Sequence, residues 1–375
     1  AAAVIGGFLF SLILFEEKCE PDASQEAALI ALYDSTNGTS WQWPSYRYRN
    51  NNWLTAEPVC KWNGVTCKGD CVTELSLEYS NLQGSIPTEI GNLKQLEYLM
   101  LDGNMITGTL PSTLGNLSNL KWLSLPRNNI SGSIPSTFGN LNNLQFMDLH
   151  KNRLSGSIPS TLGNLSNLKQ LILNRNNISG SIPSVLGNLN SLQLMHLGDN
   201  SISGAIPSTL GNLSELQAMD LTHNRITGEI PSDLGRLSKL EKFHVYFNEL
   251  TGSIPTTFGN LRNLDMLMLE GNKISGTIPS TLGNLNKKLN WIDLRDNSLT
   301  GTIPTELGRL SILSNLYVGV NDLTGTMPNE ICMLQTTYGS ATPFLMVDCE
   351  EVECPCCTQC CVDVTPVAAN NCYWF

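Results

Sequence analysis

The leucines of this chain recur in a pattern that repeats every 24 residues across its middle. In the unit spanning residues 93–116, Leu99 and Leu101 alternate with variable positions, which predicts a short strand with one buried face. Asn104 ends this strand, and its amide can bond backbone groups of neighbouring turns that would otherwise lack partners. Pro111 then prevents further strand pairing through its own nitrogen, and a short helical turn closes the unit.

The asparagine that ends each strand fixes the register of the array. It recurs in steps of 24, with one step of 25 where Lys287-Lys288 adds a residue, at Asn104, Asn128, Asn152, Asn176, Asn200, Asn224, Asn248, Asn272, Asn297 and Asn321. An imperfect first unit is centred on Ser80, which makes eleven units. Each unit can bury its leucines only against its neighbours. We therefore predict an α/β-type repeat solenoid of eleven units with a parallel concave sheet, capped at both ends.

The repeat Leu-x-x-Leu-x-Leu-x-x-Asn-x-Ile-x-Gly-x-Ile-Pro-x-x-Leu-Gly resembles the plant-type leucine-rich repeat. This type occurs in receptor-kinase ectodomains, receptor-like proteins and polygalacturonase-inhibiting proteins, and the resemblance covers roughly residues 24–345. An amphipathic helix at residues 25–33, Asn52-Trp53-Leu54 and Cys60-Lys-Trp62-Asn-Gly64-Val65-Thr-Cys67 resemble the N-terminal cap of that family. The resemblance implies a horseshoe fold and a disulfide between Cys60 and Cys67. It leaves Cys19 and Cys71 as a candidate pair.

The twelve cysteines are confined to the two ends of the chain. Four lie between Cys19 and Cys71 and eight between Cys332 and Cys372, which indicates disulfide-stapled ends and an oxidising compartment. The C-terminal sequence Cys354-Pro-Cys356-Cys357-Thr-Gln-Cys360-Cys361 is similar to the cysteine-rich ends of secreted or anchored repeat proteins of diatoms and related algae. A thiolate cluster for soft metals is the alternative, and the spacing leaves the connectivity open.

The first fifteen residues are uncharged and mostly apolar, and we interpret them as the end of a signal-anchor helix. An uncleaved signal peptide is the alternative, and either one exports the solenoid. The chain then divides into a partial signal-anchor or transmembrane segment at 1–18, an N-terminal cap at 19–71, the solenoid at 72–331 and a C-terminal cap or tail at 332–375. We expect a membrane-attached solenoid outside the cell, or a secreted one.

Net charge and motifs exclude several functions. A net charge of −11, with only 15% charged residues, disfavours a nucleic-acid partner. The sequence offers neither a set of paired carboxylates, a nucleophile elbow, a phosphate loop nor the motifs of a kinase domain. We therefore expect no enzymatic activity, no catalytic residue and no cofactor. The preferred function is recognition of a protein, peptide or anionic glycan on the concave face.

Outward-facing strand positions lie six, four, two and one residues before each asparagine, and all four histidines occupy them. His196, Asp220 and His244 stand four residues before the asparagine in three successive units, here called rungs, and so form one column across the sheet. The two histidines are two rungs, roughly 10 Å, apart, which is too far for a tetrahedral metal site, so recognition is favoured. Aromatic residues in a row indicate a contact surface, and three stacked cations indicate an anionic partner. The predicted ligand-binding residues are Tyr98, Trp122, Arg127, Phe146, His150, Lys151, Arg175, His196, Asp220, His223, His244, Tyr246 and Trp291. The histidines would add a pH dependence near ~6.5.

Two alternative functions stay open. Serine or threonine precedes the repeat glycine in ten of eleven units, and the resulting hydroxyl ladders on one flank could bind ice. The family resemblance also allows an inhibitor of a secreted hydrolase, as in the polygalacturonase inhibitors. Partial N-glycosylation is expected at six sequons, Asn37, Asn116, Asn129, Asn164, Asn177 and Asn212.

Overall fold

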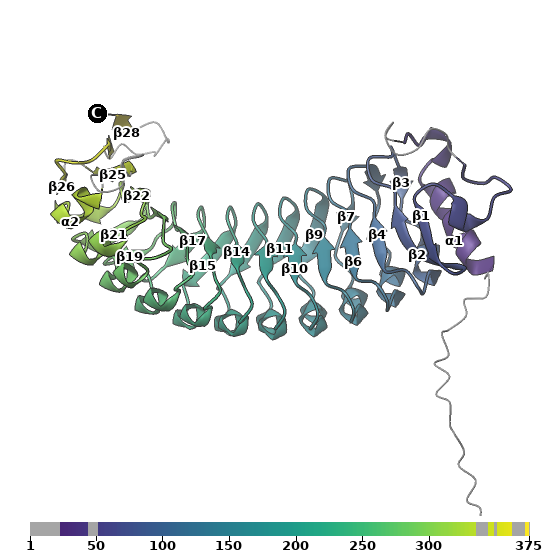
Figure 1. The fold of residues 1–375 in the computed structure, drawn as a ribbon, viewed down its shortest axis with the longest axis horizontal. Helices are drawn as coiled ribbons and strands as arrows, with labels where there is room; N and C mark the ends of the chain where they lie inside the picture. Colours follow the sequence, from purple (N-terminus) through teal and green to yellow (C-terminus); the bar gives the residue numbers. More distant parts are fainter. Residues whose placement is uncertain (1–22, 44–51, 335–343, 349–350, 362–371, 375) are drawn as a thin grey trace, which may run out of the picture.

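A computed structural model describes residues 23–43, 52–334, 344–348, 351–361 and 372–374 of the chain. Within these residues the chain forms a curved array of stacked rungs, with the N-terminal helix at one end and the cysteine-rich segment at the other (Figure 1). The array is the predicted solenoid with a parallel sheet.

The concave sheet contains 15 strands and runs the length of the array. Its strands pair in parallel from β2 to β27, whereas β1 on β2 and β28 on β27 are antiparallel. In sheet order they are β1 (Val65–Lys68), β2 (Cys71–Ser76), β4 (Tyr98–Met100), β6 (Trp122–Ser124), β8 (Phe146–Asp148), β10 (Gln170–Ile172), β12 (Leu194–His196), β14 (Ala218–Asp220), β16 (Lys242–His244), β18 (Met266–Met268), β20 (Trp291–Asp293), β22 (Asn315–Tyr317), β25 (Phe344–Asp348), β27 (Gln359–Cys361) and β28 (Cys372–Trp374).

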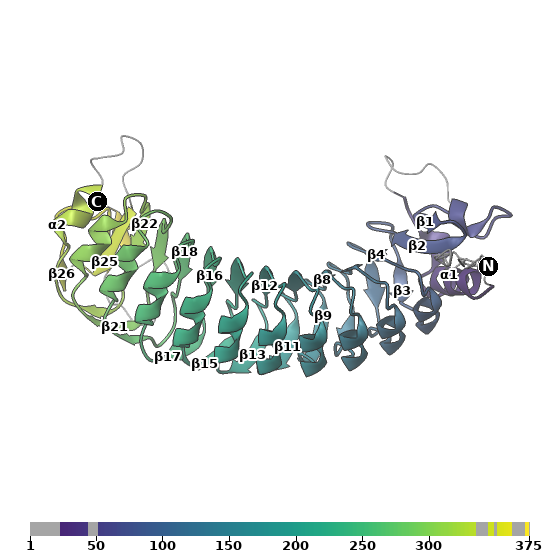
Figure 2. The ribbon, with the colours of Figure 1, turned by 60° about the horizontal axis from the view of Figure 1, so that its bottom comes forward.

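A second set of short strands forms small parallel sheets on the outer side of the arc, and Figure 2 shows β8, β12 and β16 along its inner side. The outer strands are β3 (Gln83–Ser85), β5 (Met105–Thr107), β7 (Ser131–Gly132), β9 (Arg153–Ser157), β11 (Asn177–Gly180), β13 (Ser201–Gly204), β15 (Arg225–Glu229), β17 (Glu249–Thr251), β19 (Ser275–Gly276), β21 (Ser298–Gly301), β23 (Asp322–Leu323), β24 (Gly325–Thr326) and β26 (Val352–Glu353).

A short 3₁₀ helix follows the repeat proline in ten of the eleven units and completes the rung, whereas the last repeat proline, Pro328, is followed by an α-helix. The 3₁₀ helices are η3 (Thr88–Asn92), η4 (Ser112–Asn116), η5 (Ser136–Asn140), η6 (Ser160–Asn164), η7 (Ser184–Asn188), η8 (Ser208–Asn212), η9 (Ser232–Arg236), η10 (Thr256–Asn260), η11 (Ser280–Asn284) and η12 (Thr305–Arg309). The core lies between the helices and the concave sheet, where the inward leucines of each strand, such as Leu99 and Leu101, are fully buried.

The repeated asparagines bond the backbone of successive rungs, as predicted. The Asn176 Oδ1 accepts a hydrogen bond from the Leu154 N–H at 3.0 Å, and its Nδ2 donates to the carbonyls of Leu149 and Leu173, both at 3.0 Å. Asn176 is buried. The sequence also predicts burial of Asn200, but that residue is only partly covered although it makes the same three kinds of bond.

The N-terminal end of the core is covered by α1 (Ala23–Ser35), which includes the predicted helix at residues 25–33. Its residues Ala28, Leu29 and Leu32 are fully buried. The helices η1 (Gly38–Ser40) and η2 (Val59–Lys61) follow, and a disulfide joins Cys60 to Cys67 with an S–S distance of 2.08 Å. Cys71 is also disulfide-bonded, while Cys19, its candidate partner, lies outside the described residues.

At the other end, the parallel sheet continues past residue 331 into the segment assigned to the C-terminal cap. After α2 (Asn329–Cys332), β25 pairs in parallel with β22, and β27 pairs in parallel with β25. The Asp348 carboxylate accepts hydrogen bonds from the backbone N–H groups of Val320, at 2.5 Å, and Asn321, at 3.0 Å. It thereby satisfies donors that elsewhere bond carbonyl groups of the next rung.

Disulfides hold the C-terminal segment, as its cysteine content predicts. They join Cys332 to Cys356 and Cys354 to Cys357, and none of the cysteines in the described part of the chain is a free thiol. No helix of the described residues is long and apolar enough to cross a bilayer. Residues 1–18, where the sequence predicts an anchor, lie outside the described ranges.

Candidate ligand-binding surface

Residues at the same position of successive repeats line up in columns across the concave sheet, because consecutive strands pair without a shift of register. Trp122 pairs with Tyr98 on one side and with Phe146 on the other. Two residues further along each strand, His196, Asp220 and His244 stand on three neighbouring strands. The structure therefore places the predicted columns on one face of the sheet, and their role in binding stays a prediction.

An aromatic stack stands on this face near the N-terminal end. The rings of Trp122 and Phe146 are stacked, with centroids 3.7 Å apart and an interplanar angle of 11°, and Trp122 remains 37% exposed. A shallow hollow of about 310 Å³ surrounds them, and its other lining residues are Tyr98, Lys121, Gln145, Lys169 and Gln170. The surface thus combines flat apolar area with two cations at its margin.

The two lysines of this hollow are held by polar neighbours. The Lys121 ammonium lies 2.5 Å from the Glu97 carboxylate on the preceding rung. The Lys169 Nζ donates a hydrogen bond to the Gln145 Oε1 at 3.0 Å. Neither lysine is among the predicted ligand-binding residues, because each stands seven residues before its asparagine, outside the four positions that the strand alternation marks as outward.

Arg127, Lys151 and Arg175 occupy the turn after three successive strands, and each adopts a left-handed backbone conformation, with φ of 55°, 52° and 58°. Gly103 holds the equivalent turn at φ 64° without steric cost. A non-glycine residue in this conformation costs on the order of 1 kcal/mol. The same conformation recurs at the residue before the repeat asparagine, or its equivalent, of every unit, for example at Asp199 and His223, so it belongs to the repeat turn and does not single out the basic residues. Arg175 also pairs with Asp199, at 3.3 Å between Nε and Oδ2.

The histidines of the concave face differ in their surroundings. His196 and His244 flank Asp220, and burial lowers the pKa of both imidazoles, against the opposing attraction of the Asp220 carboxylate. The predicted pH dependence near ~6.5 is therefore displaced to lower pH for this pair. The His150 Nδ1 lies 2.8 Å from the Asp148 carboxylate, and His223 stacks on Phe247 with centroids 4.8 Å apart. No group of side chains suited to a metal ion occurs among the described residues.

A charged cluster that the sequence analysis missed lies toward the C-terminal end of the same face. The Arg295 guanidinium donates hydrogen bonds to Asp293 at 2.6 and 2.9 Å and to Glu270 at 3.0 Å. It lies 5.0 Å from the ring centroid of Tyr317, which makes an edge contact with the predicted residue Trp291. Burial raises the pKa of Glu270, helped by Asp293 and opposed by Arg295. Opposite charges in adjacent outward columns were the signal that could have revealed it.

The sequon asparagines lie away from the outward columns of the concave sheet. Five of them are exposed, namely Asn37, Asn116, Asn164, Asn177 and Asn212, and Asn129 is half-buried. Asn116, Asn164 and Asn212 are the last residues of η4, η6 and η8. Glycans attached there would project from the helical side and leave the concave face accessible.

Family comparisons agree with this architecture. A leucine-rich repeat N-terminal domain matches residues 22–68, a leucine-rich repeat region matches 112–222, and further leucine-rich repeat matches cover 95–117, 214–274 and 288–310. The chain is 46% identical over 57 residues to the Arabidopsis thaliana LRR receptor-like serine/threonine-protein kinase FEI 2. That match covers 14% of this chain and 10% of the relative.

Solved structures extend the likeness over most of the solenoid. The plant peptide hormone receptor RGFR1 in complex with RGF2 is similar with a TM-score of 0.71 and 36% identity, covering 75% of this chain and 48% of that one. A plant ice-binding protein is similar with a TM-score of 0.63 and 29% identity, covering 76% of this chain and 89% of that one. The chain spans about half of the receptor chain it matches. The chain belongs to the leucine-rich repeat proteins, and its repeats and N-terminal cap resemble those of plant receptor ectodomains.

Proposed function

We propose that the concave sheet is a recognition surface for an extracellular peptide or protein, without catalytic activity. The observation that carries this proposal is the aromatic stack of Trp122 and Phe146 on strands that are followed by the basic turn residues Arg127 and Lys151. Aromatic rings supply contact area at low entropic cost, and cations orient an acidic partner by charge-assisted hydrogen bonds. The similar receptor RGFR1 was solved in complex with RGF2, which supports a ligand of this class.

The proposed location is outside the cell, with residues 1–18 as the membrane attachment and no nucleic acid or cofactor as partner. Disulfides in both caps support an oxidising compartment, and exposed sequons support passage through the secretory pathway. An anionic glycan remains within the proposed ligand range, because the basic turns suit carboxylates as well as acidic peptides.

The test of concave binding is a triple variant, Trp122→Ala with Arg127→Ser and Lys151→Ser. A ligand is first sought with the folded chain on a panel of secreted proteins, synthetic peptides and acidic oligosaccharides. We expect the variant to bind the captured ligand at least about tenfold more weakly, because it loses two charged contacts and the aromatic side chain that the ligand would cover. Titration calorimetry gives the Kd of each protein.

The matched control carries the same kinds of change on the outer side, with Val185→Ala, Arg153→Ser and Arg225→Ser, all exposed positions. This control should bind like the parent. Unchanged affinity in the folded concave variant would refute the placement of the site. Inhibition of a captured secreted hydrolase by the chain would instead identify the inhibitor alternative.

Ice binding is a second candidate, because the chain covers 89% of the similar plant ice-binding protein. The ladder hydroxyls are partly engaged within the chain, since Thr107, Ser131 and Ser275 donate to the glycine carbonyls of the preceding rung at 3.0 to 3.2 Å. The second ladder, two residues further on, is interrupted by Ala205 and Glu229. Both features reduce the regular array of free hydroxyls that ice contact requires.

An ice-recrystallisation assay distinguishes the two functions on one preparation. If the ladder binds ice, Thr109→Lys with Ser157→Lys should abolish the activity, because the charges disrupt the flat hydroxyl array. The concave triple variant should keep any such activity. We expect no inhibition of recrystallisation beyond that of an equal concentration of albumin, and inhibition that the ladder variant removes would establish ice binding.

A further inference from the structure

The single 25-residue unit changes the backbone of one loop. After η11, the N–H groups of Lys288 and Leu289 both bond the carbonyl of Leu285, at 3.3 and 3.2 Å. In the preceding unit, the equivalent Leu264 N–H bonds the carbonyl three residues earlier, that of Leu261, at 2.8 Å. The ψ angle of Leu285 is 30°, against 65° at Leu261. The inserted residue is therefore accommodated as a wider turn rather than as a shift of the following strand.

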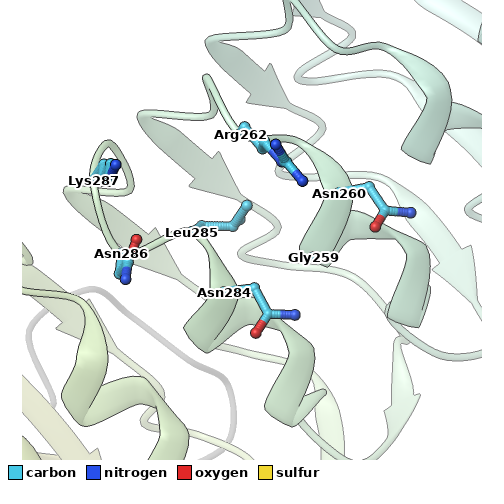
Figure 3. Close-up of a pocket in the computed structure, with 7 residues that line it drawn as sticks. All are labelled: Gly259, Asn260, Arg262, Asn284, Leu285, Asn286 and Lys287. Atoms are coloured by element: carbon cyan, nitrogen blue, oxygen red, sulfur yellow. The ribbon is translucent and has the colours of Figure 1, made fainter.

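The wider turn opens a hollow of about 380 Å³ between the ends of η10 and η11. Leu285 is among the lining residues but is only 2% exposed, and Figure 3 shows it between Arg262 of one rung and Lys287 of the next. The amides that complete the lining belong to Asn260, Asn284 and Asn286. No carboxylate lines this hollow, although the chain as a whole carries a net charge of −11.

We infer that this hollow binds an acidic saccharide unit, meaning a sugar that carries a carboxylate or a sulfate group. Arg262 and Lys287 supply charge-assisted donors for the anionic group. Asparagine amides both donate and accept hydrogen bonds, as the hydroxyl groups of a sugar require. The site is separate from the proposed concave surface, since it lies where the rung helices end.

The residues that line the hollow include no sequon. Asn260 and Asn284 occupy the helix position at which Asn116, Asn164 and Asn212 are sequons, but Arg262 and Asn286 stand where those sequons have a serine. Asn260 is therefore not a glycan acceptor, and Arg262 places a guanidinium group in the lining.

A neighbouring hollow defines the orientation of the ligand. It measures about 360 Å³, adjoins the same loop through Lys288, and is lined by the carboxylates of Glu241 and Asp265. These acids repel an anion, so the charged group of the saccharide is directed to the Arg262 and Lys287 side. A neutral sugar would lack this preference.

The test uses the folded full chain and three oligosaccharides, trigalacturonic acid, a sulfated trisaccharide and neutral galactotriose. Titration calorimetry at low salt should detect binding of at least one acidic probe and none of the neutral one. Arg262→Gln with Lys287→Gln should raise the Kd by at least about tenfold. Deletion of Lys287, which restores the 24-residue spacing, should do the same by closing the hollow. The two acidic probes distinguish a carboxylate from a sulfate ligand.

The matched control is Arg153→Gln with Arg225→Gln, which removes the same charge from the outer strands. An equal loss of binding in this control would show general charge attraction and overturn the site. Unchanged binding in the Gln variant would also overturn it. The concave triple variant should retain saccharide binding, so failure of one proposal leaves the other intact.

Discussion

Replacing Asn176 by leucine should destabilise the solenoid by about 3 kcal/mol or more, because three buried backbone groups lose their partner. The Leu154 N–H and the carbonyls of Leu149 and Leu173 each bond the Asn176 amide at 3.0 Å. Leaving a buried polar group unsatisfied costs roughly 1–3 kcal/mol, and the added leucine recovers part of this through apolar contact. Urea denaturation of parent and variant gives the difference in the free energy of unfolding.

The matched control is Asn188→Leu, an exposed asparagine of η7, which should change the stability by less than about 0.5 kcal/mol. The same substitution at the half-buried Asn200 should cost less than at Asn176, since water can reach part of its surroundings. In the Asn176→Leu variant, backbone amides of the rungs next to residue 176 should exchange their hydrogens faster than in the parent before other rungs do, because each rung contacts only its neighbours. Equal stability of the Asn176 variant and the parent would contradict the bridging role.

Much of the fold could be predicted from the sequence, because every unit of a solenoid repeats the same local structure at a fixed spacing along the chain. Once the asparagine spacing is known, residues six and four positions earlier must stand on one face, and Trp122, His196 and Asp220 do. The disulfides at both ends could also be predicted, because cysteines confined to the ends of an exported chain favour disulfides there. Register is thus readable from the sequence wherever the repeat holds.

Two features depend on atoms that a repeat pattern does not encode. The hollow beside Lys287 depends on how the chain absorbs one extra residue, and the spacing alone does not show that the loop after η11 takes it up. Burial lowers the pKa of His196, although the sequence marks its column as solvent-facing. The detailed chemistry of the face therefore required the structure.

Replacing Gly187 by alanine should destabilise the chain by about 1–3 kcal/mol, although alanine is usually the better helix former. A Cβ at this position would lie 2.4 Å from the Thr209 carbonyl oxygen and 2.8 Å from its carbon on the next rung. A backbone atom cannot move aside like the end of a flexible side chain, so the rungs must separate. The glycine in each helix thus fixes the distance between successive rungs, a role the sequence pattern does not distinguish from that of a helix end.

Thermal and urea unfolding of Gly187→Ala measure this cost, and Asn188→Ala, at the exposed next residue of the same helix, provides the control. The control should be neutral or slightly stabilising, because alanine has a high helix propensity and no neighbour obstructs it. Gly163→Ala should reproduce the effect on another rung, since its Cβ would lie 2.6 Å from the Val185 carbonyl oxygen. If both glycine variants were as stable as the Asn188 control, rung spacing would be set by the concave sheet alone, and the helices would follow it.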